Sequence, residues 1–252
     1  MSGEVLLERD GALALVTINQ PVRRNALSQA MWDAIPGVFA EAASARVVIL
    51  AGEGEHFAAG ADISEFEATY RDRASAEAAL DRLTGAMDAV AACPVPVLAA
   101  IRGACVGGGL GLALACDLRF AAPDARFAIT TAKLGLTYTL SDTKRLVDAV
   151  GIAAAKDVLF SGRTIEAEEA LRMGLASRAA DDPIAAARAY AEALAANAPA
   201  SLRATKATVA RIAGGQATDD AESRASYLDL AEGPEFREGY AAFLAKRKPD
   251  FS

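Results

Sequence analysis

Alternating apolar and polar residues near the N-terminus predict a pair of strands. The segments "EVLLERD" and "ALALVTIN" flank Asp10 and Gly11, a dipeptide typical of tight hairpin turns. Further along, "RVVILAG" and "VPVLAAI" are short runs dominated by β-branched and other apolar residues. Apolar runs of this length predict strands that are buried on both faces.

Between and after these strands, apolar residues recur at helical spacing. The segment "SQAMWDAIPGVFAEAAS" starts at Ser28, a candidate N-cap, and we expect Pro36 to kink or divide this helix. Residues 66–92 are helical in period, and "LRFAAPDARFAI" contains two short extended pieces around a Pro-Asp turn. From Ser141 onward the pattern is nearly all helical. Strands alternating with helices in the first half predict an α/β fold.

Composition and charge narrow the class of protein. With 252 residues, 53% of them hydrophobic, the chain can form one large domain with a real core, or one domain plus a small appendage. The net charge of −7 argues against a nucleic acid or an anionic membrane as the main partner. The most apolar stretch, between Arg102 and Asp117, is shorter than the about 20 residues that cross a bilayer.

The cysteines and the N-terminus indicate a reducing compartment. Cys93, Cys105 and Cys116 lie in apolar surroundings and are expected to be buried free thiols. The start of the chain has early acidic residues and no basic region, unlike a signal peptide. We therefore expect a cytoplasmic protein.

Several common chemistries lack their motifs. There is no phosphate-binding G-x-x-x-x-G-K-[ST] loop, and Leu112 stands where G-x-G-x-x-G requires its last glycine. The chain has one histidine, no Cys/His cluster with metal spacing and no G-x-S-x-G elbow. Phosphoryl transfer, hydride transfer, zinc chemistry and a Ser-His-Asp triad are therefore disfavoured.

A run of three glycines is the strongest chemical signal. Residues 103–117, "GACVGGGLGLALACD", place the run between the strand "VPVLAAI" and an apolar predicted helix, whose first amides are unpaired. The segment "EGEHFAAGADI" follows the strand "RVVILAG" with similarly small residues. One amide from each turn is expected to bind a common oxygen as an oxyanion hole. Tight helix–sheet packing, which also requires small residues, is the alternative explanation.

With these two turns the chain resembles the crotonase superfamily, the enoyl-CoA hydratases and isomerases. The similarity extends through "NQPVRRNALS", "LFSGRTIEAEEALRMGLASR" and "EGPEFREGYAAFLAKRKPDFS", and covers nearly the whole chain. It implies a ββα-spiral core over residues 1–195 and a helical trimerisation region over residues 196–252. It also implies an acyl-CoA substrate, a homotrimer or a hexamer of two trimers, no metal and no cofactor beyond the CoA moiety.

The resemblance assigns site residues. The oxyanion hole would consist of the Ala61 and Gly108 amides, which hold the thioester oxygen while an enolate forms. Arginine suits CoA phosphates, and the basic residues 246–248 could reach them from a neighbouring subunit or form a solvated face. The residues expected to contact substrate or CoA are Arg23, Arg24, Ala59, Asp62, Ile63, Gly107 and Lys248.

The chain departs from the hydratases of this family at both catalytic glutamates. The first would stand at Gly111, three positions after the oxyanion-hole glycine, and the second at Thr131, just before "LGL". Each general acid or base contributes a factor of about 10² to 10⁴. Efficient addition of water is therefore not expected, and most isomerases of the family, which keep the second glutamate, also fit poorly.

Thr130 and Tyr138 instead resemble the methylmalonyl-CoA decarboxylase branch. That reaction requires no base, because the substrate carboxylate is already ionised. It requires the oxyanion hole and hydrogen-bond donors that hold the carboxylate perpendicular to the thioester plane. The chain differs from that branch at Ala61, where the branch carries a histidine.

Other readings stay open. The chain could be an isomerase or hydratase that uses another acid such as Asp142, or a catalytically weak acyl-CoA-binding homologue. Tyr138 could be core packing, and Asp142 could be the N-cap or a first-turn acid of the helix that follows, with Ser141 as the rival cap. His56 is more typical of a surface loop, Asp62 of a helix cap, and the carboxylates of Glu65 and Glu67 of a first helical turn.

Overall fold

The predicted hairpin forms one edge of the main sheet. In the computed structural model, which describes residues 3–251, β1 (Glu4–Asp10) pairs antiparallel with β2 (Leu13–Asn19). Gly11 in the turn has a φ of +59°, a left-handed conformation that glycine adopts readily because it has no Cβ. The sheet continues in parallel through β3 (Val47–Gly52), β4 (Val97–Ile101), β6 (Leu118–Ala121) and β9 (Arg178–Ala179).

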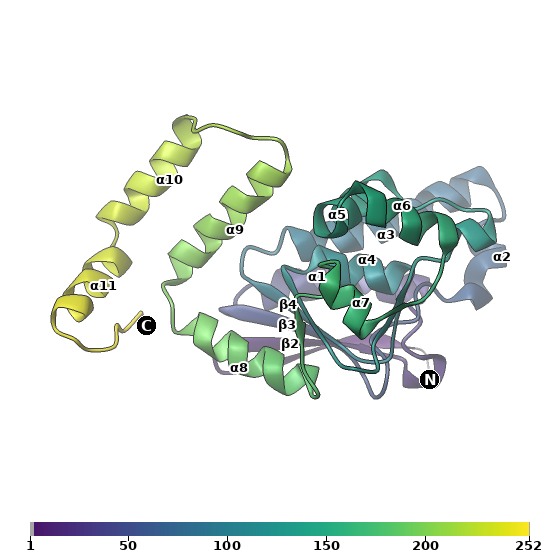
Figure 1. Ribbon diagram of the computed structural model, residues 1–252, viewed down its shortest axis with the longest axis horizontal. Helices are drawn as coiled ribbons and strands as arrows, with labels where there is room; N and C mark the ends of the chain where they lie inside the picture. Colours follow the sequence, from purple (N-terminus) through teal and green to yellow (C-terminus); the bar gives the residue numbers. More distant parts are fainter. Residues whose placement is uncertain (1–2, 252) are drawn as a thin grey trace.

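The central strands are buried on both faces, as their apolar runs predict. Successive side chains of a strand point to opposite faces. Val47 and Ile49 accordingly pack in the cluster under α8 (Pro183–Ala195), whereas Val48 and Leu50 belong to the larger core on the other face. Figure 1 shows α8 along one side of the sheet and α1, α3 and α4 on the other. The α/β prediction is confirmed.

The helices α1 (Gln29–Ala42), α3 (Arg73–Ala91) and α4 (Gly108–Ala115) cover the larger core. The Ser28 hydroxyl accepts from the Met31 amide at 3.3 Å and caps α1, as predicted. Pro36 does not divide α1, which is one continuous helix. Ile35 and Phe39 are both buried on the core side of that helix, and their packing holds it together across the missing amide.

A small second sheet leads the chain into α4. It comprises β5 (Ala104–Val106), β7 (Arg126–Ala128) and β8 (Ile165–Glu166), with β5 and β7 parallel. Strands β6 and β7 are the two extended pieces predicted around the Pro-Asp turn. Shorter helices complete the core: η1 (Pro21–Arg23), η2 (Ile63–Glu65), α2 (Phe66–Thr69), η3 (Thr131–Leu134), α5 (Leu140–Val150), α6 (Ile152–Ser161) and α7 (Ala167–Arg172).

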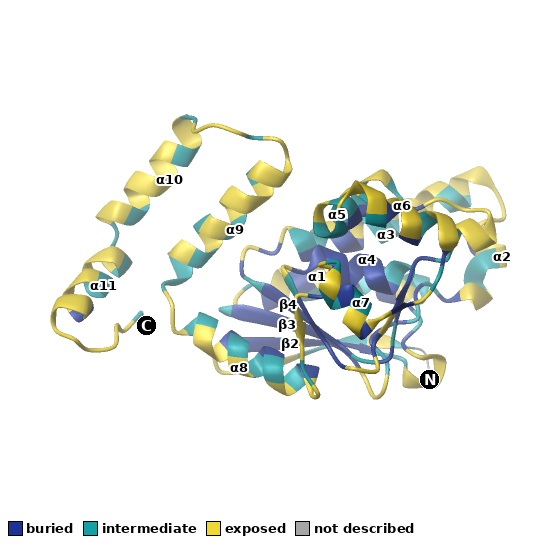
Figure 2. Cartoon of the chain, viewed as in Figure 1, coloured by how far each residue is buried: buried dark blue, intermediate teal, exposed yellow. Residues whose placement is uncertain are grey.

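The last three helices form an arm that stands apart from the core (Figure 1). They are α9 (Pro199–Ala213), α10 (Ala221–Glu232) and α11 (Pro234–Leu244), and most of their surface is exposed (Figure 2). The Arg46 guanidinium donates to the carbonyls of Ala195 and Phe251, so it ties the end of the chain back to the core. The large apolar residues exposed on this arm are Val209, Ile212, Tyr227, Leu228, Phe236, Tyr240, Phe243 and Leu244.

The three cysteines are free and buried, as predicted. Burial raises the pKa of the Cys116 thiol to about 12 and that of Cys105 well above its usual value, so these thiols stay protonated and inert. Among residues 3–251, no cluster of His, Cys, Asp and Glu could hold a metal ion. Nor does any helix in that range combine the length and the apolar character required to cross a membrane.

Candidate active site

The two glycine-containing turns lie against each other. The Ala58 amide donates to the Ala104 carbonyl at 2.9 Å, and the Val106 amide donates to the Ala58 carbonyl at 2.9 Å. These bonds pair the turn after β3 with β5, directly before α4. A Cβ placed on Gly60 would lie 2.9 Å from the Val106 carbonyl oxygen and 3.5 Å from the Gly108 nitrogen. The predicted proximity of the two turns is therefore present.

Each turn contains an amide that faces a cavity and has no hydrogen-bond partner in the described chain. The neighbouring amides of Asp62 and Gly107 donate to the carbonyls of Leu27 and Ala128 at 2.8 and 2.9 Å. Within residues 3–251, neither the Ala61 amide nor the Gly108 amide donates to any backbone carbonyl or side chain. Both residues line the same cavity, and Gly108 is the first residue of α4, at the positive end of its dipole. This arrangement can bind an anionic oxygen.

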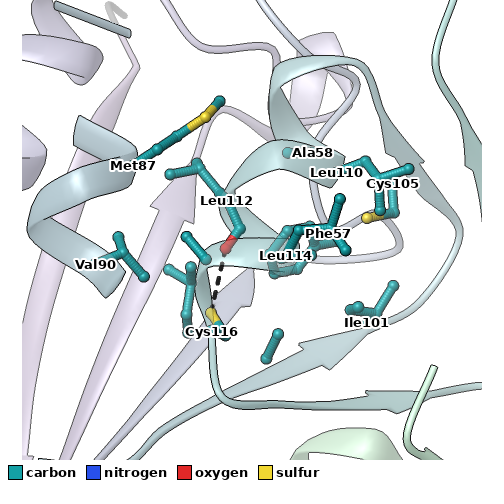
Figure 3. Packing of buried hydrophobic residues seen from close by; sticks show 14 of the residues in the cluster. Phe57, Ala58, Met87, Val90, Ile101, Cys105, Leu110, Leu112, Leu114 and Cys116 are labelled. Carbon is teal, nitrogen blue, oxygen red and sulfur yellow. Dashed lines mark hydrogen bonds between the residues drawn. The ribbon is translucent and has the colours of Figure 1, made fainter. Parts of the chain in front are cut away.

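The glycines serve packing as well as access. A Cβ on Gly109 would lie 2.5 Å from the Ala58 carbonyl oxygen, and one on Gly108 would lie 2.9 Å from the Trp32 ring. Gly107 has a φ of +53°, which disfavours any residue with a Cβ. The buried cluster around Ala58, Cys105 and Leu110 is visible in Figure 3. Tight packing, the alternative explanation, therefore accounts for the glycine at position 109. The Gly108 amide is nevertheless unpaired in the described chain.

The cavity beside these amides has a volume of about 360 Å³ and holds no charged side chain. No Asp, Glu, His, Lys or Arg is found among its lining residues in the described part of the chain. One wall is apolar and consists of Ile63, Phe66, Tyr70, Leu80, Leu83, Met87, Leu134 and Leu136. The hydroxyls on its lining, apart from that of Tyr70, belong to Thr130, Thr131, Thr137, Tyr138 and Thr139.

Gly111, where the resemblance predicts the first family glutamate, is crowded by other side chains. A Cβ on Gly111 would lie 2.4 Å from Met87 Cε and 3.0 Å from Tyr138 Oη. Met87 reaches this point from α3, on the side that faces α4 (Figure 3). No sequence pattern signals this role, because Met87 is one more apolar residue at helical spacing.

Tyr138 lies between core and cavity. Its hydroxyl donates to the Gly107 carbonyl at 3.0 Å, directly beside the Gly108 amide. Burial raises the pKa of Tyr138 well above its usual value, so the phenol is neutral and can act as a donor. The hydroxyls of Thr130 and Thr131, which also line the cavity, have no hydrogen-bond partner among residues 3–251.

Asp142, the alternative proton carrier, does not line the cavity. Its side chain is fully buried, and its two oxygens accept from Thr139 Oγ1 at 2.6 Å and from Arg145 at 2.8 Å. The helix α5 starts earlier than expected, at Leu140, and its N-cap is Thr139. Neither Ser141 nor Asp142 is the N-cap, so that alternative is wrong, whereas the prediction of Asp142 as a first-turn acid is confirmed.

Two carboxylates occupy a smaller adjoining cavity of about 40 Å³, which shares Ala61 and Phe66 with the large one. Asp62 caps η2, as predicted, by accepting from the Ser64 amide at 3.0 Å, and it also pairs with Arg23. Glu65 accepts from the Gln29 amide at 2.7 Å at the start of α1. Both carboxylates therefore stabilise the ends of helices.

The remaining predicted residues are distributed between the cavity rim and the arm. Ala59, Gly107 and Ile63 line the cavity, and Ile63 is 71% exposed. Arg24 is exposed, and its guanidinium has no partner within residues 3–251. Lys248 does not line this cavity; it follows α11, which lies at the opposite end of the molecule from α2 (Figure 1).

His56 and Glu67, the two remaining candidates near the first turn, lie outside the large cavity. His56 lies behind the turn, where its Nδ1 accepts from the Ala104 amide at 3.2 Å. Glu67 is exposed on α2 and does not line the large cavity. The structure therefore gives His56 a role in holding the turn and leaves Glu67 at the surface.

Comparisons with known proteins agree with this geometry. Residues 8–252 match the family model described as enoyl-CoA hydratase/isomerase. A relative from Thermus thermophilus that carries the name of an enoyl-CoA hydratase is 37% identical over 263 residues, 96% of this chain and 98% of its own.

Solved structures agree as well. A structure of an enoyl-CoA hydratase/isomerase family protein from Hyphomonas neptunium superposes with a TM-score of 0.96 at 43% identity, covering 98% of this chain and 97% of that one. A structure from Magnetospirillum magneticum, described as an enoyl-CoA hydratase/carnithine racemase, has a TM-score of 0.94 at 38% identity, covering 98% and 95%. The expected spiral core with a helical C-terminal region is confirmed by these similarities.

Proposed function

The chain belongs to the enoyl-CoA hydratase/isomerase family and acts on an acyl-CoA thioester, and from that premise we propose that it decarboxylates a malonyl-CoA-type thioester. The observation that carries the proposal is the uncharged cavity beside the Ala61 and Gly108 amides. Neither position of the family's glutamates holds a carboxylate, and the space above Gly111 is filled by Met87 and Tyr138. Decarboxylation is the enolate reaction that does not require such a base.

The reaction proceeds through an enolate held by the two amides. The bond between the α-carbon and the substrate carboxylate breaks, CO₂ leaves, and the electron pair moves into the thioester, whose oxygen becomes negative. The Ala61 and Gly108 amides donate to that oxygen, and each such donor contributes roughly 3 kcal/mol to lowering the barrier. A proton from water then adds to the α-carbon, which yields the shortened acyl-CoA.

The hydroxyls of the cavity orient the carboxylate. In the absence of substrate the Tyr138 O–H donates to the Gly107 carbonyl, and on binding it turns from that carbonyl to the substrate carboxylate. Thr130 has a hydroxyl without a partner in the described chain. Together they hold the carboxylate out of the thioester plane, where the breaking bond overlaps the carbonyl π system. Because the wall is apolar and uncharged, the carboxylate loses much of its hydration there, which favours release as neutral CO₂.

The CoA moiety and the arm complete the proposed assembly. Arg24 and Lys248, both without an ion-pair partner in the described chain, contact CoA phosphates, Lys248 from a neighbouring subunit. Arg23 is already paired with Asp62 and contributes by holding that turn. The exposed apolar residues of α9–α11 pack against other copies in a homotrimer or hexamer. The free, buried thiols suit a cytoplasmic location.

Hydration or isomerisation is the second candidate, because several similar proteins carry hydratase names. The carboxylates that could replace the glutamates as proton carriers are those of Asp62 and Glu65, which line the adjoining cavity. Both already accept hydrogen bonds. A hydratase would have to free one of them.

The test compares two substrates by mass spectrometry. We expect CO₂ release from malonyl-CoA or methylmalonyl-CoA and negligible hydration of crotonyl-CoA. Fast hydration of crotonyl-CoA without CO₂ release from either dicarboxylic thioester contradicts the proposal and supports the second candidate.

A further inference from the structure

The amide of Ala61 lies in a segment without regular structure, which other parts of the chain must hold in place. After β3 the chain runs to Asp62 with only two isolated bridges, Ala58 to Cys105 and Leu27 to Ala61. On one side the segment is bonded to β5. On the other side it is bonded to residues 24–27, which belong to neither a helix nor a strand.

The contacts on that second side surround Ala61. The Ala59 amide donates to the Arg24 carbonyl at 2.9 Å, the Leu27 amide donates to the Gly60 carbonyl at 2.7 Å, and the Asp62 amide donates to the Leu27 carbonyl at 2.8 Å. Residues 24–27 therefore fix the backbone immediately before and after the free amide. Any movement of this segment moves the Ala61 nitrogen.

One fully buried side chain holds residues 24–27 in place. Asn25 has no exposed surface, and its Oδ1 accepts from the Gln20 amide at 2.9 Å. Its Nδ2 donates to the carbonyls of Glu53 and His56 at 2.9 and 2.6 Å. Glu53 and His56 open the same segment that ends at Ala61. The Asn25 side-chain amide thus joins the start of the segment that ends at Ala61 to residues 24–27, which flank its end.

The chemistry of this position calls for asparagine. The backbone of Asn25 has a φ of +56°, a left-handed conformation that Asn tolerates better than other non-glycine residues. Its side chain must accept one hydrogen bond and donate two. Aspartate has the same shape but would place a carboxylate against two carbonyl oxygens. A buried charge or an unsatisfied carbonyl in this place is costly.

We propose that Asn25 is a positioning residue for the Ala61 amide, and that its side chain sets the geometry of the oxyanion hole without touching substrate. The inference rests on the proposed role of Ala61, and it adds a residue that the family resemblance assigned no function. Because it concerns the position of an amide, it can be tested without turnover.

The experiment records amide resonances of Ala61 and Gly108 by NMR as butyryl-CoA is added. The variants are Asn25→Asp and the milder Asn25→Ser, which keeps one donor. Asn19→Asp is the matched control, because within residues 3–251 the Asn19 side chain bonds only to the exposed Glu4 carboxylate, at 3.3 Å. In the wild type and the control, both amide protons are expected to shift as they bind the thioester oxygen.

In the Asn25 variants the shift of the Ala61 amide proton on adding butyryl-CoA should be less than half of its wild-type value, whereas the shift of the Gly108 amide proton should be retained. The effect of Asn25→Ser should lie between that of Asn25→Asp and the wild type. Where turnover is measurable, kcat should fall about 10- to 100-fold with KM nearly unchanged. Variants that only lower Tm, with the wild-type Ala61 response and kcat, overturn the inference. If the wild type does not decarboxylate either substrate but the Asn25 variants still lose the Ala61 response, the proposed reaction is wrong and the role of Asn25 stands.

Discussion

At the scale of single residues, the unusual feature is which groups are missing from the cavity. Within residues 3–251 the amides of Ala61 and Gly108 have no hydrogen-bond partner. The positions where the resemblance predicts the family's two glutamates hold Gly111 and Thr131. Tyr138 stands beside the Gly108 amide as a neutral donor. The site can thus stabilise negative charge on oxygen, but it offers no charged group to move a proton.

Tyr138→Phe tests the donor proposed for the carboxylate. The change removes the hydroxyl that bonds to Gly107 and keeps the ring in the core. A hydrogen bond to a charged group is worth about 1.5–3 kcal/mol, so CO₂ release should slow roughly 10- to 100-fold. The measurement is kcat for malonyl-CoA or methylmalonyl-CoA decarboxylation. An unchanged kcat would assign Tyr138 to packing alone.

Asp62 gives a pH dependence with a definite sign. Burial alone raises the pKa of this carboxyl, but hydrogen bonds from Ser64 and the Arg23 guanidinium hold it below its ordinary value of 3.8. A lowered pKa in the folded state stabilises the fold above the unfolded pKa, and this stability is lost as the pH falls through the folded value.

The prediction compares Asp62→Asn with the wild type in denaturant unfolding. We expect the variant to be less stable near pH 7 and the difference to shrink as the pH falls below about 4. A difference that grows on acidification would show that the carboxyl is not stabilised in its ionised form.

At the scale of elements, the site depends on how closely α4 packs on the first turn. Gly109→Ala would place a Cβ 2.5 Å from the Ala58 carbonyl oxygen and should separate the two turns. Overpacking of this kind costs about 1–3 kcal/mol. The variant should unfold at lower denaturant concentration and lose most of its activity.

Gly85→Ala is the matched control, because it lies within α3 and a Cβ there meets nothing within 4 Å. Alanine in a helix interior is favoured over glycine by about 0.5–1 kcal/mol. The control should therefore be slightly more stable, with unchanged activity. Equal effects of the two substitutions would refute the packing argument.

The elements themselves were largely predictable, whereas their tertiary partners were not. Period-two and helical patterns predicted β1, β2, α1 and the buried strands, and the glycine turns predicted two free amides. The continuity of α1 through Pro36 and the cap at Thr139 depend on packing and on local competition between hydroxyls. Met87 fills the space above Gly111 from a segment that is distant in sequence, which no local pattern reports.

At the scale of the whole molecule, we expect the exposed arm to pack against other copies of the chain. Ala242 is the one buried residue in the described helices α9–α11, and Lys206 joins α9 to the core through Val95 and Asp117. Phe236 and Phe243 are 58% and 81% exposed, and most of the arm is exposed with them (Figure 2). Isolated chains rarely expose apolar residues over such a length. We expect light scattering to give the mass of three or six chains of 26.0 kDa.

Charge placed on the arm should weaken this assembly. The double variant Phe236→Arg, Phe243→Arg should shift the mass toward a single chain, whereas Phe160→Arg, at an exposed residue outside the arm, should shift it less. A wild-type protein that is monomeric at micromolar concentration would contradict the proposed role of the arm.

The most direct test of the account is a crystal structure with an unreactive malonyl-CoA analogue bound. The account predicts that the thioester oxygen lies about 2.7–3.1 Å from both the Ala61 and the Gly108 nitrogens, with the carboxylate near Tyr138 and Thr130. A thioester oxygen bound by any other group, with either amide left unoccupied, would contradict it.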